Sequence, residues 1–281
     1  MPVIEVARQA GACYGVERAL KMALEASDSA SQPVHTLGPL IHNPLVVADL
    51  EERGVLPAAD PAEAGSGTLV IRAHGVTPQV IADAEARGLA VVDATCPYVK
   101  RVHRAAARLA AEGYQVLVVG ESGHPEVQGI LGHAGEGARV VSDEDDLAGL
   151  ALCDKVGVVV QTTQTAERLA HVVAALVGRV GELRVINTIC EATSERQAAA
   201  AELAERSDVM IVIGGRESGN TRRLAQICRE RCMNTHHIED AAELDAAWFD
   251  EAERIGITAG ASTPAEQIER TVAQIEQVVA S

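Results

Sequence analysis

The segment AVVDATCPYVKRVHRAAARLAAE, residues 90–112, decides the fold. Residues 90–93 form a short β-branched run of the kind found in buried strands, and residues 100–112 have the Ala-rich pattern of a helix. Cys96 lies in the turn between them. A strand that passes through a short turn into a helix is the unit from which parallel sheets are built. The segment therefore predicts an α/β protein.

The same plan occurs twice more along the chain. Residues 3–6 lead through Cys13 into a helix-like stretch at 16–26, and residues 184–187 lead through Cys190 into another at 194–206. A second polar loop follows each cysteine after about 28 residues, and a third loop closes each copy. These loops contain His42, His124 and Ser218, and then His74, Thr162 and Ser262. The repeat predicts three similar α/β domains, residues 1–93, 94–187 and 188–281, arranged as a pseudo-threefold trefoil.

The nine loops of this repeat are expected at the carboxyl ends of strands. Ligands bind at those ends in parallel α/β sheets, because the loops that follow the strands converge there. Three cysteines and six polar loops would then surround one central cavity. The alternative is that three similar units simply stack and that the cysteines are small buried hydrophobic residues.

Three converging cysteines indicate a soft metal site. Thiolates select zinc, cuprous copper or iron–sulfur clusters, and the chain lacks the close C-x2-C pair of a zinc ribbon. A cubane cluster ordinarily takes four cysteine ligands, so three would leave one iron open to act as a Lewis acid on a substrate oxygen. The other cysteines are not expected to be ligands: Cys153 is predicted to pack before a strand, and Cys228 and Cys232, on one face of a helix, to have a structural or incidental role.

Two polar motifs suggest how a substrate is handled. His124-Pro125-Glu126 offers a carboxylic acid beside an imidazole, which suits a proton donor with its positioning group. Residues 214–221 match a phosphate loop except that Asn220 replaces the lysine, which argues against an NTPase. A helix start rich in hydroxyl groups still presents N–H groups to an anion. A diphosphate cradle is therefore predicted from His42, His74, Thr162, Ser218, Asn220 and Ser262.

Composition excludes several other classes of function. The chain has 281 residues with 24 Lys and Arg against 40 Asp and Glu, a formal net charge of −16, and only 2% aromatic residues. This charge repels phosphate backbones and anionic lipids, and few rings are available to stack on bases. We therefore expect no nucleic-acid partner and no membrane partner. No secretory or transit signal is recognised at the N-terminus, so a cytoplasmic location with reduced thiols is expected.

Six short segments support a more specific interpretation. They are Gly11–Val16, Ala73–Val76, Asp93–Pro97, Gly123–Glu126, Gln161–Thr163 and Thr258–Ser262. Together, and in this order, they resemble the 4-hydroxy-3-methylbut-2-enyl diphosphate reductase family, also called IspH or LytB, over essentially the whole chain. The resemblance implies a trefoil around one [4Fe–4S] cluster. It also implies the last step of the methylerythritol phosphate route, which gives isopentenyl and dimethylallyl diphosphates with electrons from ferredoxin or flavodoxin.

The resemblance also implies a role for individual residues. Cys13, Cys96 and Cys190 would hold three irons and leave the fourth without a protein ligand. Glu126 would supply the proton that removes the hydroxyl group as water, with His124 and Thr162 in the proton path. The residues implied around the diphosphate and the rest of the substrate are His42, His74, His124, Thr163, Thr193, Ser218, Asn220 and Ser262. The chain departs from the family at Ala12, where an aromatic residue is usual, and at Gly219, where a second serine is usual.

Two other functions compete with this one. An iron–sulfur hydro-lyase that eliminates water from a hydroxylated anionic substrate would use the same open iron, but it would turn over without a reductant. A non-catalytic regulator that binds metal or phosphate would need a surface for a macromolecule, and no basic patch is recognised in the sequence.

Overall fold

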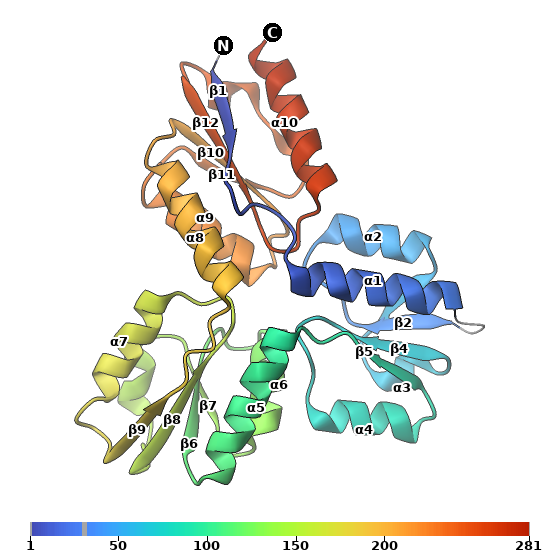
Figure 1. The fold of residues 1–281 in the computed structure, drawn as a ribbon, viewed down its shortest axis with the longest axis vertical. Coiled ribbons are helices and arrows are strands. Elements are labelled where there is room, and N and C mark those ends of the chain that lie inside the picture. Colours follow the sequence, from blue (N-terminus) through green and yellow to red (C-terminus); the bar gives the residue numbers. More distant parts are fainter. Residues whose placement is uncertain (1, 30–32, 281) are drawn as a thin grey trace. The chain divides into compact units, whose positions relative to one another are not determined.

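The computed structural model describes residues 2–29 and 33–280, and the predicted domain limits at residues 1 and 281 lie outside them. Three parallel four-stranded sheets alternate with helices along this part of the chain (Figure 1). Sheet A contains β1 (Val3–Val6), β12 (Arg254–Ala259), β10 (Val209–Ile213) and β11 (Thr235–Ile238) in that order. The predicted α/β class is confirmed.

The other two sheets repeat the strand order of sheet A. Sheet B runs β5 (Ala90–Asp93), β4 (Thr68–Ile71), β2 (Val34–Leu37) and β3 (Val55–Ala58). Sheet C runs β9 (Glu182–Val185), β8 (Lys155–Val160), β6 (Gln115–Val119) and β7 (Arg139–Val141). In each sheet the strand that leads to a cysteine lies at one edge. The sequence repeat is therefore a repeat of sheet topology.

The first strand pairs differently from the prediction. β1 was expected in a first domain of residues 1–93, but its residues pair in parallel with β12, from Val3 with Arg254 to Val6 with Ile257. In each sheet an edge position is filled by the strand that precedes a cysteine. In sheet A this edge, beside β12, is filled by β1, which precedes Cys13. The domain limits 1–93, 94–187 and 188–281 stay a proposal.

Proline residues mark where many of the helices begin. α2 (Pro44–Glu52), α3 (Pro61–Ala64), α4 (Pro78–Ala86), α5 (Pro97–Ala111) and α6 (Pro125–Ala134) all start on proline. Proline suits the first helical position because its missing N–H would have no partner there and its φ angle already fits a helix. The remaining helices are α1 (Tyr14–Ser29), α7 (Ala166–Leu176), α8 (Glu191–Ala204), α9 (Gly219–Arg229) and α10 (Ala265–Val279).

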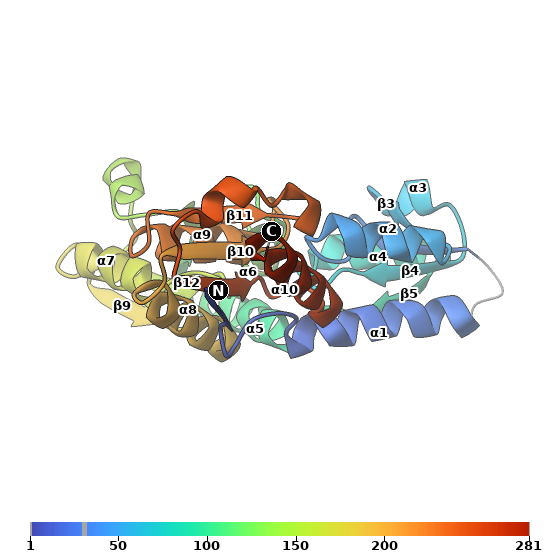
Figure 2. The ribbon, with the colours of Figure 1, turned by 90° about the horizontal axis from the view of Figure 1, so that it is seen from above.

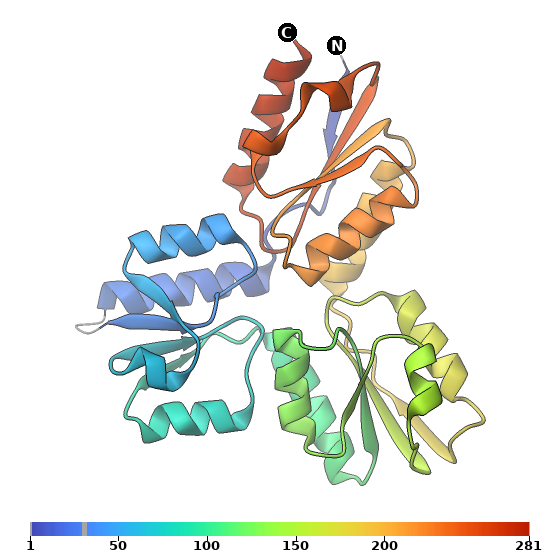
Figure 3. The same cartoon turned by 180° about the vertical axis from the view of Figure 1, so that it is seen from behind.

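Both faces of sheet A are buried, as parallel sheets require. Met210 and Val212 of β10 pack in a cluster with residues of α8 and α9, and the alternate residues Val209, Ile211 and Ile213 pack in a cluster with residues of α10. Figure 3 shows α9 and α10 on opposite sides of this sheet. A continuous apolar run in the sequence thus becomes a central strand because both of its faces are covered.

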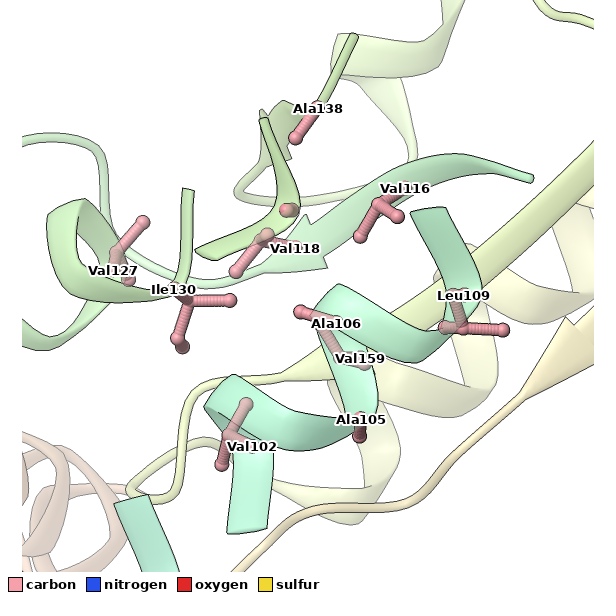
Figure 4. Packing of buried hydrophobic residues seen from close by; sticks show 11 residues of the cluster. Val102, Ala105, Ala106, Leu109, Val116, Val118, Val127, Ile130, Ala138 and Val159 are labelled. Atoms are coloured by element: carbon pink, nitrogen blue, oxygen red, sulfur yellow. The ribbon is translucent and has the colours of Figure 1, made fainter. Parts of the chain in front are cut away.

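Sheet C has the same two-layer covering. Val102, Ala106 and Leu109 of α5 pack against β6 and β8, together with Val127 and Ile130 of α6 (Figure 4). On the other face β6 and β8 pack in a cluster with residues of α7. A Cβ added at Gly157 of β8 would lie 2.9 Å from Leu109 Cδ1. The leucine therefore fills the space that this glycine leaves open.

The described chain divides into two compact units. Unit 1 contains residues 2–16, 42–47 and 191–280, and unit 2 contains residues 17–29, 33–41 and 48–190. Sheet A belongs to unit 1, and sheets B and C belong to unit 2. In the part of the chain that is described, no helix is both long enough and apolar enough to cross a bilayer.

Candidate functional site

Each cysteine turn is held by the same hydrogen bond. The backbone N–H of Cys13 donates to the carbonyl of Ala261 at 3.1 Å, that of Cys96 to Ala73 at 3.0 Å and that of Cys190 to Thr162 at 3.1 Å. Each acceptor lies just beyond the strand next to the cysteine's own strand, which is β12, β4 or β8. All nine loops of the repeat follow the carboxyl ends of strands, as predicted.

Glu126 is a buried carboxyl group in unit 2. It lies in the first turn of α6 and is 2% exposed. The backbone N–H of Thr162 donates to its Oε1 at 2.7 Å, and the Thr162 hydroxyl contacts its Oε2 at 2.8 Å. Thr162 comes directly after β8 and α6 comes after β6, so the neighbouring strands β6 and β8 bring together two residues 36 positions apart.

Burial controls the protonation of this carboxyl group. Complete desolvation raises the pKa of Glu126 from 4.5 to about 7, although the backbone and hydroxyl hydrogen bonds from Thr162 both lower it. A carboxyl group with this pKa carries its proton for a large part of the time near neutral pH. Thr162 thus donates to both carboxyl oxygens of the ionised form, through its backbone N–H to Oε1 and through its hydroxyl to Oε2.

His124 is the N-cap of the same helix. Its Nδ1 accepts the backbone N–H of Glu126 at 3.1 Å, so a neutral His124 carries its proton on Nε2. The ring packs edge to face with that of His74, with 5.6 Å between the ring centroids. Two imidazoles from the loops after β4 and β6 thus lie together in unit 2, and Glu126 is joined to one of them through the helix start.

A third histidine supports this arrangement, and it was not recognised in the sequence. His103 of α5 is 5% exposed and stacks on His133 with 4.1 Å between ring centroids. A Cβ on Gly75 would lie 2.6 Å from its Cε1, and a Cβ on Gly129 would lie 3.1 Å from its Nε2. The ring therefore fits between the loop that carries His74 and the helix that carries Glu126. In the sequence, the only indication of this packing is that Gly75 and Gly129, next to the ring, lack side chains.

His103 is also kept uncharged. Its pKa is lowered from 6.5 to about 4, mainly because burial removes water from the charged form and further because of His133. Its Nε2 has no hydrogen-bond partner among the described residues. Because the His103 ring is neutral, it places no positive charge near Glu126. The pKa of Glu126 is then set by burial and by its hydrogen bonds with Thr162.

Unit 1 joins two of the predicted diphosphate loops through Asn43. This side chain, 2% exposed, accepts the N–H groups of Leu45 and Val46 at the start of α2, and its amide donates to the carbonyl of Ser262 at 2.8 Å. A Cβ on Gly215 would lie 2.3 Å from the carbonyl oxygen of His42. Glycine at 215 therefore allows the loop after β10 to approach the loop that contains His42.

The start of α9 is the clearest anion-binding feature of unit 1. Ser218 is its N-cap and accepts the N–H of Thr221 at 3.3 Å. Asn220 is 4% exposed, and neither its amide nitrogen nor its amide oxygen has a hydrogen-bond partner among the described residues. A buried amide normally finds partners, so an unpartnered one beside helix N–H groups points to a ligand. Because asparagine replaces the lysine of the phosphate-loop pattern, the groups that could bind an anion here are neutral: the Asn220 amide and the backbone N–H groups of the helix start.

The two units divide the predicted site residues between them. Unit 2 contains Cys96, Cys190, His74, His124, Glu126, Thr162 and the half-buried Thr163. Unit 1 contains Cys13, His42, Ser218, Asn220, Ser262 and the buried Thr193 of α8. The functional assignment of each of these residues stays a prediction.

The cysteines differ in exposure. Cys13, Cys96 and Cys190 are half-buried and outside disulfides, and no three His, Cys, Asp or Glu side chains within residues 2–29 and 33–280 gather as a site for a metal ion. Cys228 and Cys232 are both buried, but Cys232 lies beyond the end of α9, so the prediction that the two share one helix face is wrong. Cys153 is exposed, so the prediction that it packs in a core is wrong.

Comparisons with known proteins agree over almost the whole chain. The family model for the LytB protein matches residues 4–276. The 4-hydroxy-3-methylbut-2-enyl diphosphate reductase of Geobacter sp. (strain M21) is 48% identical over 274 residues, covering 97% of this chain and 96% of the relative. The enzyme of the same name from Geobacter sulfurreducens is 49% identical and covers 98% of this chain and 97% of its own.

Solved structures show the same relationship. The structure of (E)-4-hydroxy-3-methyl-but-2-enyl diphosphate reductase, the terminal enzyme of the non-mevalonate pathway, is 46% identical with a TM-score of 0.73, covering 99% of this chain and all of that one. The structure of E-1-hydroxy-2-methyl-but-2-enyl-4-diphosphate reductase from Plasmodium falciparum is 28% identical with a TM-score of 0.92, covering 97% of this chain and 87% of that one. Matches of this extent in sequence and in structure lead to one conclusion: the chain belongs to the LytB family of 4-hydroxy-3-methylbut-2-enyl diphosphate reductases.

Proposed function

We propose that this chain catalyses the reductive dehydroxylation of 4-hydroxy-3-methylbut-2-enyl diphosphate. The substrate loses its hydroxyl group as water and takes up two electrons and two protons, which gives isopentenyl and dimethylallyl diphosphates. The observation that carries the proposal is Glu126, a fully buried acid held by Thr162 with a pKa of about 7, in a chain that matches reductases of this name over almost its entire length.

We infer that the cofactor is a [4Fe–4S] cluster held by Cys13, Cys96 and Cys190. The donor set fits: three half-buried thiols outside disulfides follow three equivalent edge strands, and each backbone N–H is engaged with a neighbouring loop. Soft thiolates are the ligands that iron–sulfur clusters take. When bound, the cluster would supply the electrons and a Lewis-acidic iron for the hydroxyl group.

The protein's own contribution to the chemistry is proton delivery. Glu126 carries a proton for a large part of the time near pH 7, and its hydrogen bond with the Thr162 hydroxyl gives that proton a path toward the substrate. The leaving hydroxyl group needs that proton because water is a far better leaving group than hydroxide. His124 is tied to the Glu126 backbone and keeps the carboxyl group at the start of the helix.

The diphosphate is bound by neutral donors rather than by a cluster of lysines. The Nε2 proton of His124, the hydroxyl of Ser218 and the amide of Asn220 are suited to phosphate oxygens, and the N-terminus of α9 adds its backbone dipole. His42, His74 and Ser262 complete the proposed set, with Thr163 and Thr193 beside the rest of the substrate. Local donors of this kind outweigh a remote charge of −16, which salt screens over about 10 Å.

The test of this function is dependence on a reductant. Anaerobic protein should convert the hydroxylated diphosphate only with an electron source, for which we propose reduced ferredoxin or flavodoxin, and the products should be the two isomeric diphosphates. An iron–sulfur hydro-lyase would consume the substrate without added electrons. Turnover that is equal with and without reductant, followed by substrate loss and product analysis, would therefore reject the reductase.

A pH profile provides a second check. Glu126 must be protonated to act as an acid, so the active form exists below its pKa and is lost as the pH rises through about 7. We expect kcat at saturating reductant and substrate to fall by about tenfold per pH unit on the alkaline limb. Replacing Thr162 by Val removes its hydroxyl from the proton path, so kcat should fall; it also removes a hydrogen bond that lowers the pKa of Glu126, so the limb of the remaining activity should move to higher pH. A limb that stays in place in this variant would contradict the assignment.

A further inference from the structure

Helix α5 presents a basic face to solvent. Its buried side, which includes Val102, Ala106 and Leu109, packs on sheet C, and the helix lies beside α6 (Figures 1 and 2). Its outer side carries Lys100, Arg101, Arg104 and Arg108, which we call the basic face. The three arginines are exposed and Lys100 is half-buried. Residues 97–111 contain no Asp or Glu, so the face has no acid of its own.

Little in the surrounding structure neutralises these cations. Lys100 lies 2.5 Å from a carboxylate oxygen of Asp93, and among the described residues no carboxylate lies within ion-pair distance of Arg101, Arg104 or Arg108. The chain as a whole has a charge of −16, so a helix face with three arginines outside ion pairs is a local exception. The prediction that the chain has no basic patch is therefore wrong for α5. The four cations are one to four positions apart in the sequence, and they come to lie on one face only when this segment forms a helix.

The basic face begins beside a proposed cluster ligand. Cys96 is the N-cap of α5, and the N–H of Lys100 donates to its carbonyl at 2.9 Å, so the first cation lies one helical turn from the cysteine. Tyr98, in the same first turn, is 40% exposed. A helix rises about 1.5 Å per residue, so the basic face extends over about 12 Å from Lys100 to Arg108.

A cavity opens along the same face. Its volume is about 380 Å³, and its polar lining includes Lys100 with its partner Asp93, the unpaired Arg104 and the half-buried His133. An apolar hollow with cationic side chains at its border suits an acidic partner surface that inserts a side chain. The cavity and the basic face lie entirely in unit 2.

We propose that the basic face of α5 is the docking surface for an acidic one-electron carrier protein. This inference rests on the proposed function, which requires two electrons for each substrate. Two reduced carriers would dock in turn, each would give up one electron and leave oxidised, and the two electrons would enter at the Cys96 end of the helix. Electron-transfer complexes are small and transient, and complementary charge accelerates their formation more than it tightens them.

The experiment compares two electron sources on one variant. In Arg101→Glu/Arg104→Glu/Arg108→Glu, made in the full chain with its iron content measured, the KM for reduced ferredoxin should rise by about tenfold or more at low ionic strength. Turnover with reduced methyl viologen, a small cation that needs no docking surface, should not fall. In the unmodified protein the rate with ferredoxin should fall steeply as salt is added, and the variant should lose this dependence.

A matched control has the same change in net charge elsewhere in unit 2. Arg53→Glu/Arg87→Glu/Arg139→Glu reverses three exposed arginines outside α5, and its KM for ferredoxin should remain near that of the unmodified protein. Equal increases in both variants would show a general charge effect and overturn the proposal, as would an unchanged KM in the α5 variant.

Three further results distinguish a failure of the docking surface from a failure of the proposed function and from binding of a nucleic acid. If the triple variant does not fold, the single change Arg101→Gln should still raise the KM by about two- to threefold, and no increase there rejects the docking surface. If the unmodified protein turns over with neither reductant, the proposed function fails instead. Duplex DNA that binds the unmodified protein and competes away ferredoxin would assign the face to a nucleic acid and reject the acidic carrier.

Discussion

Replacing Glu126 by Gln should lower kcat by about 10²–10⁴-fold, the range that a positioned general acid contributes. The amide has nearly the shape of the acid, so its oxygen can still accept the N–H of Thr162 and its NH₂ group can donate to the hydroxyl that lies 2.8 Å from Oε2. Folding and substrate binding should therefore survive, and what is lost is the proton. We expect a KM within about threefold of the unmodified value and an unchanged iron content.

The control for this variant is Glu136→Gln. Glu136 is an exposed carboxyl group shortly after the end of α6, and its replacement is the same change of side chain. Its kcat should stay at the unmodified value. If Glu126→Gln retained full turnover with reduced ferredoxin and with a chemical reductant, Glu126 would not be in the proton path. The pH limb near 7 would then belong to another group.

The second large effect is expected at the cysteines. Changing Cys13, Cys96 or Cys190 to Ser should reduce the iron and acid-labile sulfide from about four of each per chain to well under one, and reductase activity should fall by about 10³-fold or more. A serine hydroxyl has nearly the size of a thiol but stays protonated and binds iron weakly. The measurement is iron and sulfide analysis, with visible absorption, of anaerobically prepared and reconstituted protein.

Cys153→Ser is the matched control for these variants. Cys153 is exposed and precedes β8, so it lies at the opposite end of sheet C from Cys190, which follows β9. Its replacement should leave iron, sulfide and turnover unchanged. Four irons retained in any of the three ligand variants would remove that cysteine from the cluster. Loss of iron in the Cys153 variant as well would show that the assay reports general damage to the protein.

Much of the fold was predictable because it depends on neighbours in the sequence. The β-branched runs, the prolines at helix starts and the three cysteine turns are local features, and their repetition predicted three equivalent sheets. Pairing of β1 was not predictable in this way. Whether the strand Val3–Val6 joins the sheet that follows it or the sheet that contains Arg254–Ile257 depends on which sheet edge is open.

The candidate site also has features that the sequence predicts and features that depend on the fold. The residue types that point to a thiolate cluster, a proton donor and a diphosphate cradle are all readable from the loops, including Glu126, Asn220 and the three cysteines. Their states are not. The raised pKa of Glu126 comes from burial and from a partner 36 residues away, and the neutral His103 fits a space that Gly75 and Gly129 leave open.

The sequence by itself thus determined the class of fold, the repeat and the kind of chemistry, because side-chain identity and local spacing carry that information. Only the tertiary structure decided which acid is protonated, which histidine is kept neutral and where the arginines of α5 form one face. Protonation depends on desolvation and on contacts between distant segments, and a surface exists only once a helix has packed its other side against a sheet.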